Sequence, residues 1–267
     1  MSFAPVDQVT LDRPEAELTA LSRPGTGRPI VLLHGGMADA PAWRQVTDRL
    51  APGRPLLVPN RRGRRGSTDP DASYSVQTEV DDLLAWVSTL PGPVDLLAHS
   101  MGGLISTEAV RQGAPVASLA LYDPVARPFA DDRARAAIRR ATAAGDLDTV
   151  AALINTAVSG YAEEHVTRLR ATAAWAALVK LAGPAAAELD AIDAFEPPWS
   201  DYARLSVPVT LIAGEHTVHR SPYGDSVAAF KRALGVDVVV LEGQDHIAHV
   251  AAPELLAETL AAHLRSR

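Results

Sequence analysis

Short runs of apolar and β-branched residues alternate along the chain with longer stretches of helical periodicity. Six runs are continuous enough to predict buried strands: residues 29–35, 55–60, 93–100, 116–123, 207–214 and 236–243. Buried strands separated by helices are typical of a parallel sheet with crossover helices. The segment 6–25 alternates more weakly, which indicates a hairpin at the sheet edge. The sequence therefore predicts an α/β fold.

This rhythm breaks between Asp123 and Val207, where no run predicts a strand. Residues 130–195 are rich in alanine and have helical spacing, with glycines and a proline pair as interruptions. We predict that residues 127–200 form a helical insertion between two strands of a core made of residues 1–126 and 201–267. The insertion could be one more helical layer. We expect a cap instead, because both flanking strands deliver their ends to that edge.

The strongest chemical signal is the sequence LLAHSMGG at residues 96–103. A predicted strand runs directly into Ser100 and then into a helical pattern, which is the setting of a nucleophile elbow. The sharp turn of an elbow requires small residues two positions before and after the serine, and Ala98 and Gly102 meet that requirement. The alternative is a serine that caps the helix of an ordinary strand-to-helix turn.

A second strand ends in His34, Gly35 and Gly36. Paired glycines allow a backbone N–H to turn towards a neighbouring loop, as an oxyanion hole requires. We expect the N–H groups of Gly36 and Met101 to form that hole, the latter at the positive end of its helix. His34 is expected to have a structural role.

The candidate general base lies near the carboxyl end of the chain, where a strand is followed by a short loop with His246. A histidine at this place can accept the serine proton and return it to a leaving group. His249 is the rival, but it should point along the start of the next helix. The pairs His216/His219 and His246/His249 also have zinc-ligand spacing, yet neither has a carboxylate at a suitable distance along the chain.

Composition narrows the functions that the chain can have. The net charge of −7 argues against general affinity for nucleic acids or for anionic membranes, and the absence of cysteine excludes disulfides and thiolate nucleophiles. Four arginines fall within residues 60–67, but no aromatic residues interleave with them, so we interpret this loop as a structural brace. No secretory pattern or run of about 20 apolar residues is present, and we expect a cytoplasmic protein.

Taken together and in this order, these motifs resemble the α/β-hydrolase fold, and most of all its compact, capped members. The resemblance implies a Ser–acid–His order. In many members the acid stands three residues past the glycine that ends the strand at 207–214, where this chain has Thr217. Some members instead carry it at the end of the strand after the nucleophile helix, which here ends on Asp123. We therefore expect Asp123 to be the acid, with Glu215 as the alternative.

The resemblance further implies a serine hydrolase without cofactor or metal, acting on a carboxylic ester, thioester or lactone through an acyl-enzyme. Ser100, Asp123 and His246 would be catalytic. The alanine-rich insertion separately indicates an apolar pocket, so we expect the small-molecule substrate to carry an apolar acyl group. The alternatives on the same scaffold are a cyclase, a lyase or an enzyme acting on C–C bonds that uses Ser100 and His246 as acid and base, an acyltransferase, and a binding protein. The sequence determines neither the substrate nor the oligomeric state.

Overall fold

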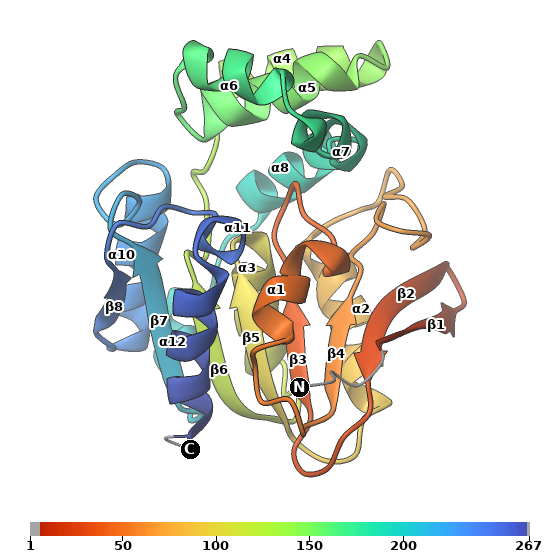
Figure 1. Ribbon diagram of the computed structural model, residues 1–267, viewed down its shortest axis with the longest axis vertical. Coiled ribbons are helices and arrows are strands. Elements are labelled where there is room, and N and C mark those ends of the chain that lie inside the picture. The colour runs from red at the N-terminus through yellow and green to blue at the C-terminus, as the bar shows by residue number, and fades with distance from the viewer. Residues whose placement is uncertain (1–5, 266–267) are drawn as a thin grey trace.

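A computed structural model describes residues 6–265 of the protein. A sheet of eight strands forms its centre (Figure 1). The strands lie in the order β1-β2-β4-β3-β5-β6-β7-β8. Their bounds are Asp7–Arg13 (β1), Ala16–Arg23 (β2), Ile30–Leu33 (β3), Leu56–Pro59 (β4), Val94–His99 (β5), Val116–Tyr122 (β6), Val209–Gly214 (β7) and Val238–Leu241 (β8). Each of the six predicted runs contains one of these strands, and the predicted hairpin is β1 and β2.

The sheet is parallel from β4 to β8, and only the β1–β2 hairpin and its junction with β4 are antiparallel. Every residue of β3, β4 and β5 is buried, as expected for central strands that are covered on both faces. All parallel strands end at the same edge, so the residues that follow β3, β5, β6 and β7 are brought close together.

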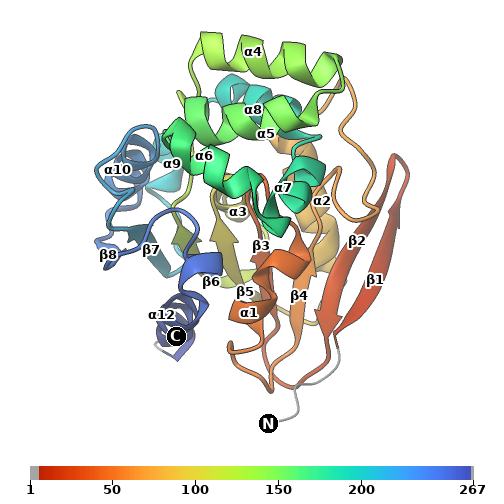
Figure 2. The ribbon, with the colours of Figure 1, turned by 45° about the horizontal axis from the view of Figure 1, so that its top comes forward.

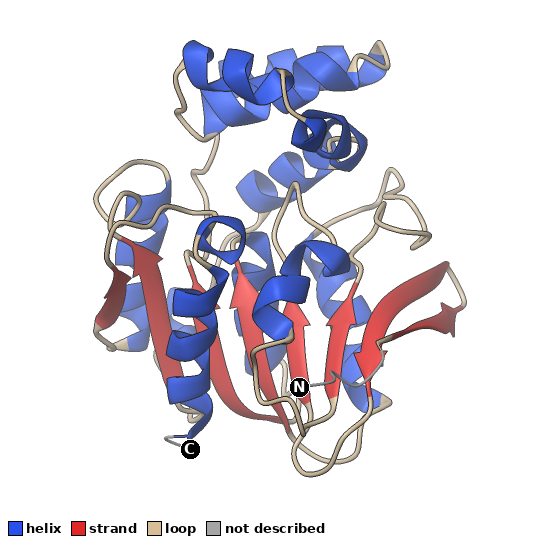
Figure 3. Ribbon diagram, in the orientation of Figure 1, coloured by secondary structure: helices blue, strands red, loops and turns tan. Residues whose placement is uncertain are grey.

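Helices cover both faces of the sheet (Figure 3). One apolar core joins the sheet to α2 (Val76–Ser88), α3 (Met101–Arg111) and α10 (Tyr223–Leu234). A second core, on the opposite face, joins it to α12 (Pro253–Arg265) and to the short helices η1 (Ala40–Trp43), α1 (Arg44–Thr47) and α11 (Ala248–Ala251). None of the described helices is long and apolar enough to cross a membrane.

The helical insertion lies between β6 and β7 in the chain, and the described residues between these strands form helices and loops only. Helices α4 to α8 stand beyond the carboxyl ends of the strands in Figure 1 and again in the turned view of Figure 2, whereas α9 packs beside the sheet against α3 and α10. Their bounds are Asp132–Ala143 (α4), Leu147–Leu153 (α5), Ile154–Val158 (η2), Glu163–Arg170 (α6), Ala173–Leu181 (α7), Ala185–Ala194 (α8) and Trp199–Tyr202 (α9). The predicted fold class, a mostly parallel sheet flanked by helices, is confirmed. The boundaries of the predicted cap remain a prediction.

Candidate active site

Ser100 stands at the sharp turn between β5 and α3. Its backbone has φ 55° and ψ −126°, a combination that costs roughly 1–3 kcal/mol for a residue with a side chain. The Ser100 N–H donates to the Tyr122 carbonyl at 3.0 Å, which holds the turn against the end of β6. Strain of this kind persists only where the surrounding structure enforces it, and it is the backbone feature of a nucleophile elbow.

Two glycines permit the close packing around this turn. A Cβ atom on Gly35 would lie 2.5 Å from Ser100 Cβ, and one on Gly102 would lie 2.4 Å from the Leu33 carbonyl oxygen. Real Cβ atoms do not approach other atoms so closely, so both positions require glycine. The loop after β3 and the start of α3 can therefore lie directly beside the serine.

The two N–H groups predicted to hold an oxyanion belong to Gly36 and Met101. Met101 is the first residue of α3, so its N–H has no partner within the helix. Among the hydrogen bonds of the described residues, neither of these N–H groups is a donor. Unpaired N–H groups at a helix start and in an adjacent glycine loop are suited to bind a developing negative charge.

The structure brings Asp123 and His246 together. Asp123 follows β6, is fully buried, and has its Oδ2 atom 3.1 Å from His246 Nδ1. Glu215, the alternative acid, is exposed and accepts a hydrogen bond from the Gly243 N–H at 2.7 Å. The carboxylate that meets the histidine is thus the one at the end of β6, although 123 residues separate the pair along the chain.

Several contacts hold the His246 loop in place. The Tyr122 hydroxyl donates to the Asp245 carbonyl, and His99 Nε2 lies 2.9 Å from the His246 carbonyl, to which it must donate. The ring of Tyr223 packs on the His246 ring at 4.1 Å between centroids. Burial lowers the pKa of His99 well below its usual value and raises the pKa of Tyr223 to about 12, so both neighbours are neutral near pH 7.

Among the described residues, no hydrogen bond joins Ser100 Oγ to the His246 ring. Both side chains are largely buried, with exposed fractions of 7% for Ser100 and 9% for His246. Catalytic hydrogen bonds are often long in enzymes without substrate and shorten in the substrate complex. The geometry thus supplies the strained serine, the N–H pair and the Asp123–His246 pair at one edge of the sheet.

His249, the rival base, has a different environment. Its ring stacks on Trp43 at 4.5 Å with an angle of 7° between the planes. His216 and His219 are exposed on the loop after β7. Residues 6–265 contain no group of three or more His, Cys, Asp or Glu side chains that could hold a metal ion.

The buried state of His249 leads to a pH prediction. Burial, and next the neighbouring His246, lowers the pKa of His249 from 6.5 to about 3. Between these values the unfolded chain binds a proton that the folded protein excludes, so the free energy of unfolding should fall as pH decreases from about 6.5 towards 3. Urea unfolding at several pH values should give a shallower decrease for His249→Gln. Equal slopes in the two proteins would contradict this assignment.

The arginine-rich loop at residues 60–67 forms buried ion pairs beside the site. Arg64 Nη2 lies 2.9 and 3.1 Å from the two carboxylate oxygens of Glu188, a residue of α8, and Arg61 Nη1 lies 3.1 Å from Glu188 Oε1. Arg61 Nη2 also contacts Met101 Sδ at 3.0 Å. A Cβ atom on Gly36 would lie 3.3 Å from Glu188 Oε2. The predicted brace is thus connected to the inserted helix α8 and to both predicted oxyanion donors.

Sequence reasoning did not identify Glu188. The sequence does contain an indication of its burial, because Glu188 shares the apolar stripe of α8 with Ala185, Leu189 and Ile192, all of which are buried. A carboxylate on such a stripe requires a buried cationic partner. The sequence also contained the cationic partner, because the arginines of residues 60–67 had been assigned no acidic partner.

Replacing Glu188 with glutamine should destabilise the fold. The change keeps the shape of the side chain but removes the carboxylate paired with the buried Arg64 guanidinium, whereas Arg61 keeps its second partner, Glu79; loss of a buried charge partner typically costs about 3–5 kcal/mol. Urea unfolding measures this loss. The control is Glu196→Gln at the exposed Arg127–Glu196 pair, where little change is expected. Similar midpoints for both variants would show that burial of the Glu188 pair does not matter.

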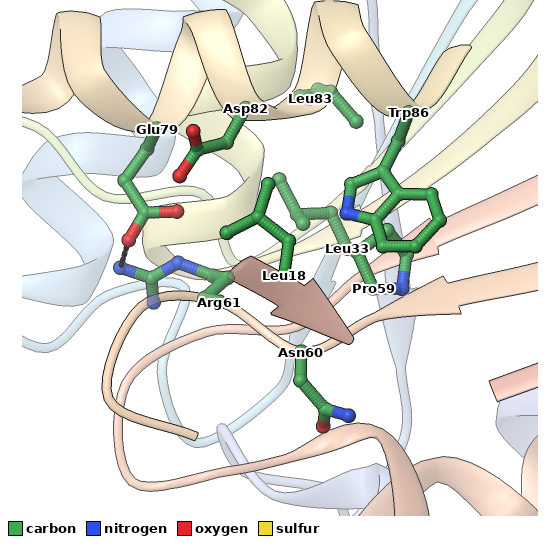
Figure 4. A pocket seen from close by; sticks show the side chains of 9 residues that line it. All are labelled: Leu18, Leu33, Pro59, Asn60, Arg61, Glu79, Asp82, Leu83 and Trp86. Atoms are coloured by element: carbon green, nitrogen blue, oxygen red, sulfur yellow. Dashed lines mark hydrogen bonds and ion pairs between the residues drawn. The ribbon is translucent and has the colours of Figure 1, made fainter. Parts of the chain in front are cut away.

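A small cavity beside Arg61 is separate from this site (Figure 4). It lies under α2, is lined by Arg61, Glu79 and Trp86 among others, and has a volume of about 10 Å³. Such a space holds roughly one water molecule and no substrate.

Comparison with known proteins agrees with the fold described above. The sequence model of the Alpha/beta hydrolase family matches residues 30–259. The chain is similar to (E)-2-((N-methylformamido)methylene)succinate hydrolase of Acinetobacter baylyi, with 27% identity over 254 residues, covering 91% of this chain and 92% of the relative.

Solved structures of low sequence identity share the fold. The crystal structure of an alpha/beta hydrolase from Sphaerobacter thermophilus has a TM-score of 0.82 at 22% identity and covers 96% of this chain and 100% of its own. The enol-lactonase from Burkholderia xenovorans has a TM-score of 0.78 at 20% identity, with coverage of 96% and 100%.

Proposed function

Because the chain belongs to the alpha/beta hydrolase family and is a hydrolase, we propose that it cleaves a carboxylic ester, thioester or lactone through an acyl-enzyme on Ser100. The observation that carries this proposal is the strained Ser100 turn, beside unpaired N–H groups and at the same edge as the Asp123–His246 pair. An activated serine with an oriented histidine is the arrangement of nucleophilic acyl transfer.

In the first half of the reaction, Ser100 Oγ attacks the substrate carbonyl and His246 Nε2 takes the hydroxyl proton. Asp123 holds the Nδ1–H of the same ring, which fixes the tautomer and offsets the positive charge on the imidazolium. The oxyanion accepts hydrogen bonds from the N–H groups of Gly36 and Met101. When the tetrahedral intermediate collapses, the bond to the leaving group breaks and His246 returns the proton to it.

In the second half, water attacks the acyl-enzyme. His246 removes a proton from this water and then gives it to Ser100 Oγ as the acid product leaves. Every charge in the cycle is balanced by groups of the chain itself, with Asp123 opposite the imidazolium and the N–H pair opposite the oxyanion. The cycle requires no cofactor.

We further propose that the helical insertion, residues 127–200, caps the active site and selects the substrate. Two contacts support this: the Tyr161 hydroxyl donates to Asp245 Oδ1 at 2.8 Å, and Ser159 Oγ lies 2.9 Å from the Tyr223 hydroxyl. Both join the insertion to the surroundings of His246. The low exposure of Ser100 is also in keeping with a covered site.

The alanine-rich composition of the insertion favours an apolar acyl group. A lactone would have a parallel in the Burkholderia enol-lactonase, whereas the Acinetobacter hydrolase is named for a succinate derivative, which is an anionic acid. A panel of 4-nitrophenyl esters with acyl chains of increasing length would establish the preferred size.

Labelling with a fluorophosphonate probe tests the proposed function. One probe molecule should attach to each wild-type chain, and none should attach to Ser100→Ala, because the reagent reacts with activated serines. Protection by a substrate ester would place the reaction in the substrate site. Failure to label, together with no ester turnover, would instead favour the alternative in which Ser100 and His246 act only as acid and base.

A further inference from the structure

Thr217 occupies the position where many members of the family carry their acid, and its side chain points to the acid of this chain. Thr217 is fully buried on the loop after β7. Its Oγ1 atom lies 3.0 Å from Asp123 Oδ1 and 2.9 Å from Asp123 Oδ2. The usual position and the relocated acid therefore meet in space, although they are 94 residues apart in the chain.

The direction of this hydrogen bond follows from the number of protons available. The Thr217 hydroxyl has one proton and three acceptors nearby, the two Asp123 oxygens and the Gly214 carbonyl at 3.0 Å. That carbonyl already accepts from the N–H groups of Thr217 at 3.1 Å and Val218 at 2.9 Å. An ionised carboxylate is also the stronger acceptor. The hydroxyl proton is thus directed to Asp123.

We propose that Thr217 is a positioning residue that orients the Asp123 carboxylate towards His246 by donating its hydroxyl proton to it. This inference rests on the proposed function, in which Asp123 holds the imidazole. The end of β6 supplies the carboxylate, and the loop after β7 supplies the hydroxyl that orients it.

The contacts of the carboxylate show why a positioning donor is needed. Rotation about the last bond of an aspartate side chain is only weakly restricted. Asp123 Oδ2 faces His246 Nδ1, and Oδ1 lies 3.3 Å from the Gly214 N–H, a long contact. Thr217 Oγ1 is almost equidistant from both oxygens, so it holds the plane of the carboxylate from a third side. Its hydroxyl also stabilises the negative charge of Asp123, which is buried away from water.

The test replaces Thr217 with valine, which has the same shape without the hydroxyl, and with serine, which keeps the hydroxyl. With 4-nitrophenyl acetate as substrate, Thr217→Val should lower kcat by about 10- to 100-fold and leave KM nearly unchanged, as expected for a lost hydrogen bond to a charged group. Thr217→Ser should recover most of kcat. The downfield proton resonance of the His246 Nδ1–H should shift in Thr217→Val and return in Thr217→Ser.

Equal kcat and an unshifted resonance in Thr217→Val would overturn the proposal. An equal loss in Thr217→Val and Thr217→Ser would also overturn it, because methyl packing would then explain the effect. If Thr217→Val does not fold, Thr217→Ala measured against Thr217→Ser replaces it in the same comparison. Ser100→Ala separates the two proposals: substantial turnover in that variant contradicts the proposed function, whereas an inactive Ser100→Ala with a fully active Thr217→Val contradicts only the role of Thr217.

Discussion

Replacing Ser100 with alanine is expected to lower the turnover of 4-nitrophenyl acetate by about 10³-fold or more while the protein stays folded. The variant lacks the oxygen that attacks the carbonyl in the proposed mechanism. Alanine keeps the Cβ atom, so the strained backbone at this turn has the same steric environment. Initial rates at saturating ester, corrected for the uncatalysed reaction, give the ratio.

Ser106→Ala is the matched control. Ser106 lies on the same helix, α3, and is fully buried, but it is not part of the elbow. Its replacement should leave turnover close to that of the unmodified protein. If Ser100→Ala kept more than about a tenth of the turnover, Ser100 would not be the nucleophile and the acyl-enzyme mechanism would be wrong.

Replacing Asp123 with asparagine is expected to lower kcat by about 10³- to 10⁴-fold, the size of effect known for the same change in a well-studied triad. The amide has nearly the shape of the carboxylate but carries no charge to offset the imidazolium. Its NH₂ group can also donate to His246 Nδ1, which would leave the proton on Nε2, where it blocks the serine. Steady-state kinetics measure the loss, and urea unfolding checks that the fold is retained.

Glu215→Gln is the control for the choice of acid. Glu215 is exposed, and the only described hydrogen bond of its side chain is the one it accepts from the Gly243 N–H, which a glutamine oxygen can also accept. Its activity should therefore change little. A large loss in Glu215→Gln with a small one in Asp123→Asn would reverse the assignment of the acid and leave Ser100 and His246 in place.

The sharp turn at Ser100 and the strands were predictable because their signals are local. A run of apolar residues reports burial on both faces of a strand, and the small residues around Ser100 report a turn that excludes larger ones. The position of Asp123 was predictable for a similar reason, since it directly follows the last residue of β6. Each of these features depends on fewer than about ten neighbouring residues.

The contacts between distant segments were not predictable in this way. Thr217 was visible only as the residue that replaces a missing acid, and Glu188 only as one carboxylate in an alanine-rich helix. Whether either side chain is paired depends on which strands are neighbours and on how the insertion packs on the core. Periodicity along one segment contains no information about those arrangements.

The sequence by itself thus determined the order of the elements, the turn that strains Ser100 and the absence of an acid at the usual place after β7. The tertiary structure alone decided which side chains surround the Asp123 carboxylate. Because β6 and β7 are adjacent in the sheet, the carboxylate after one strand lies within 3.0 Å of the hydroxyl after the other. A buried charge needs donors around it, and these donors come from segments that only folding brings together.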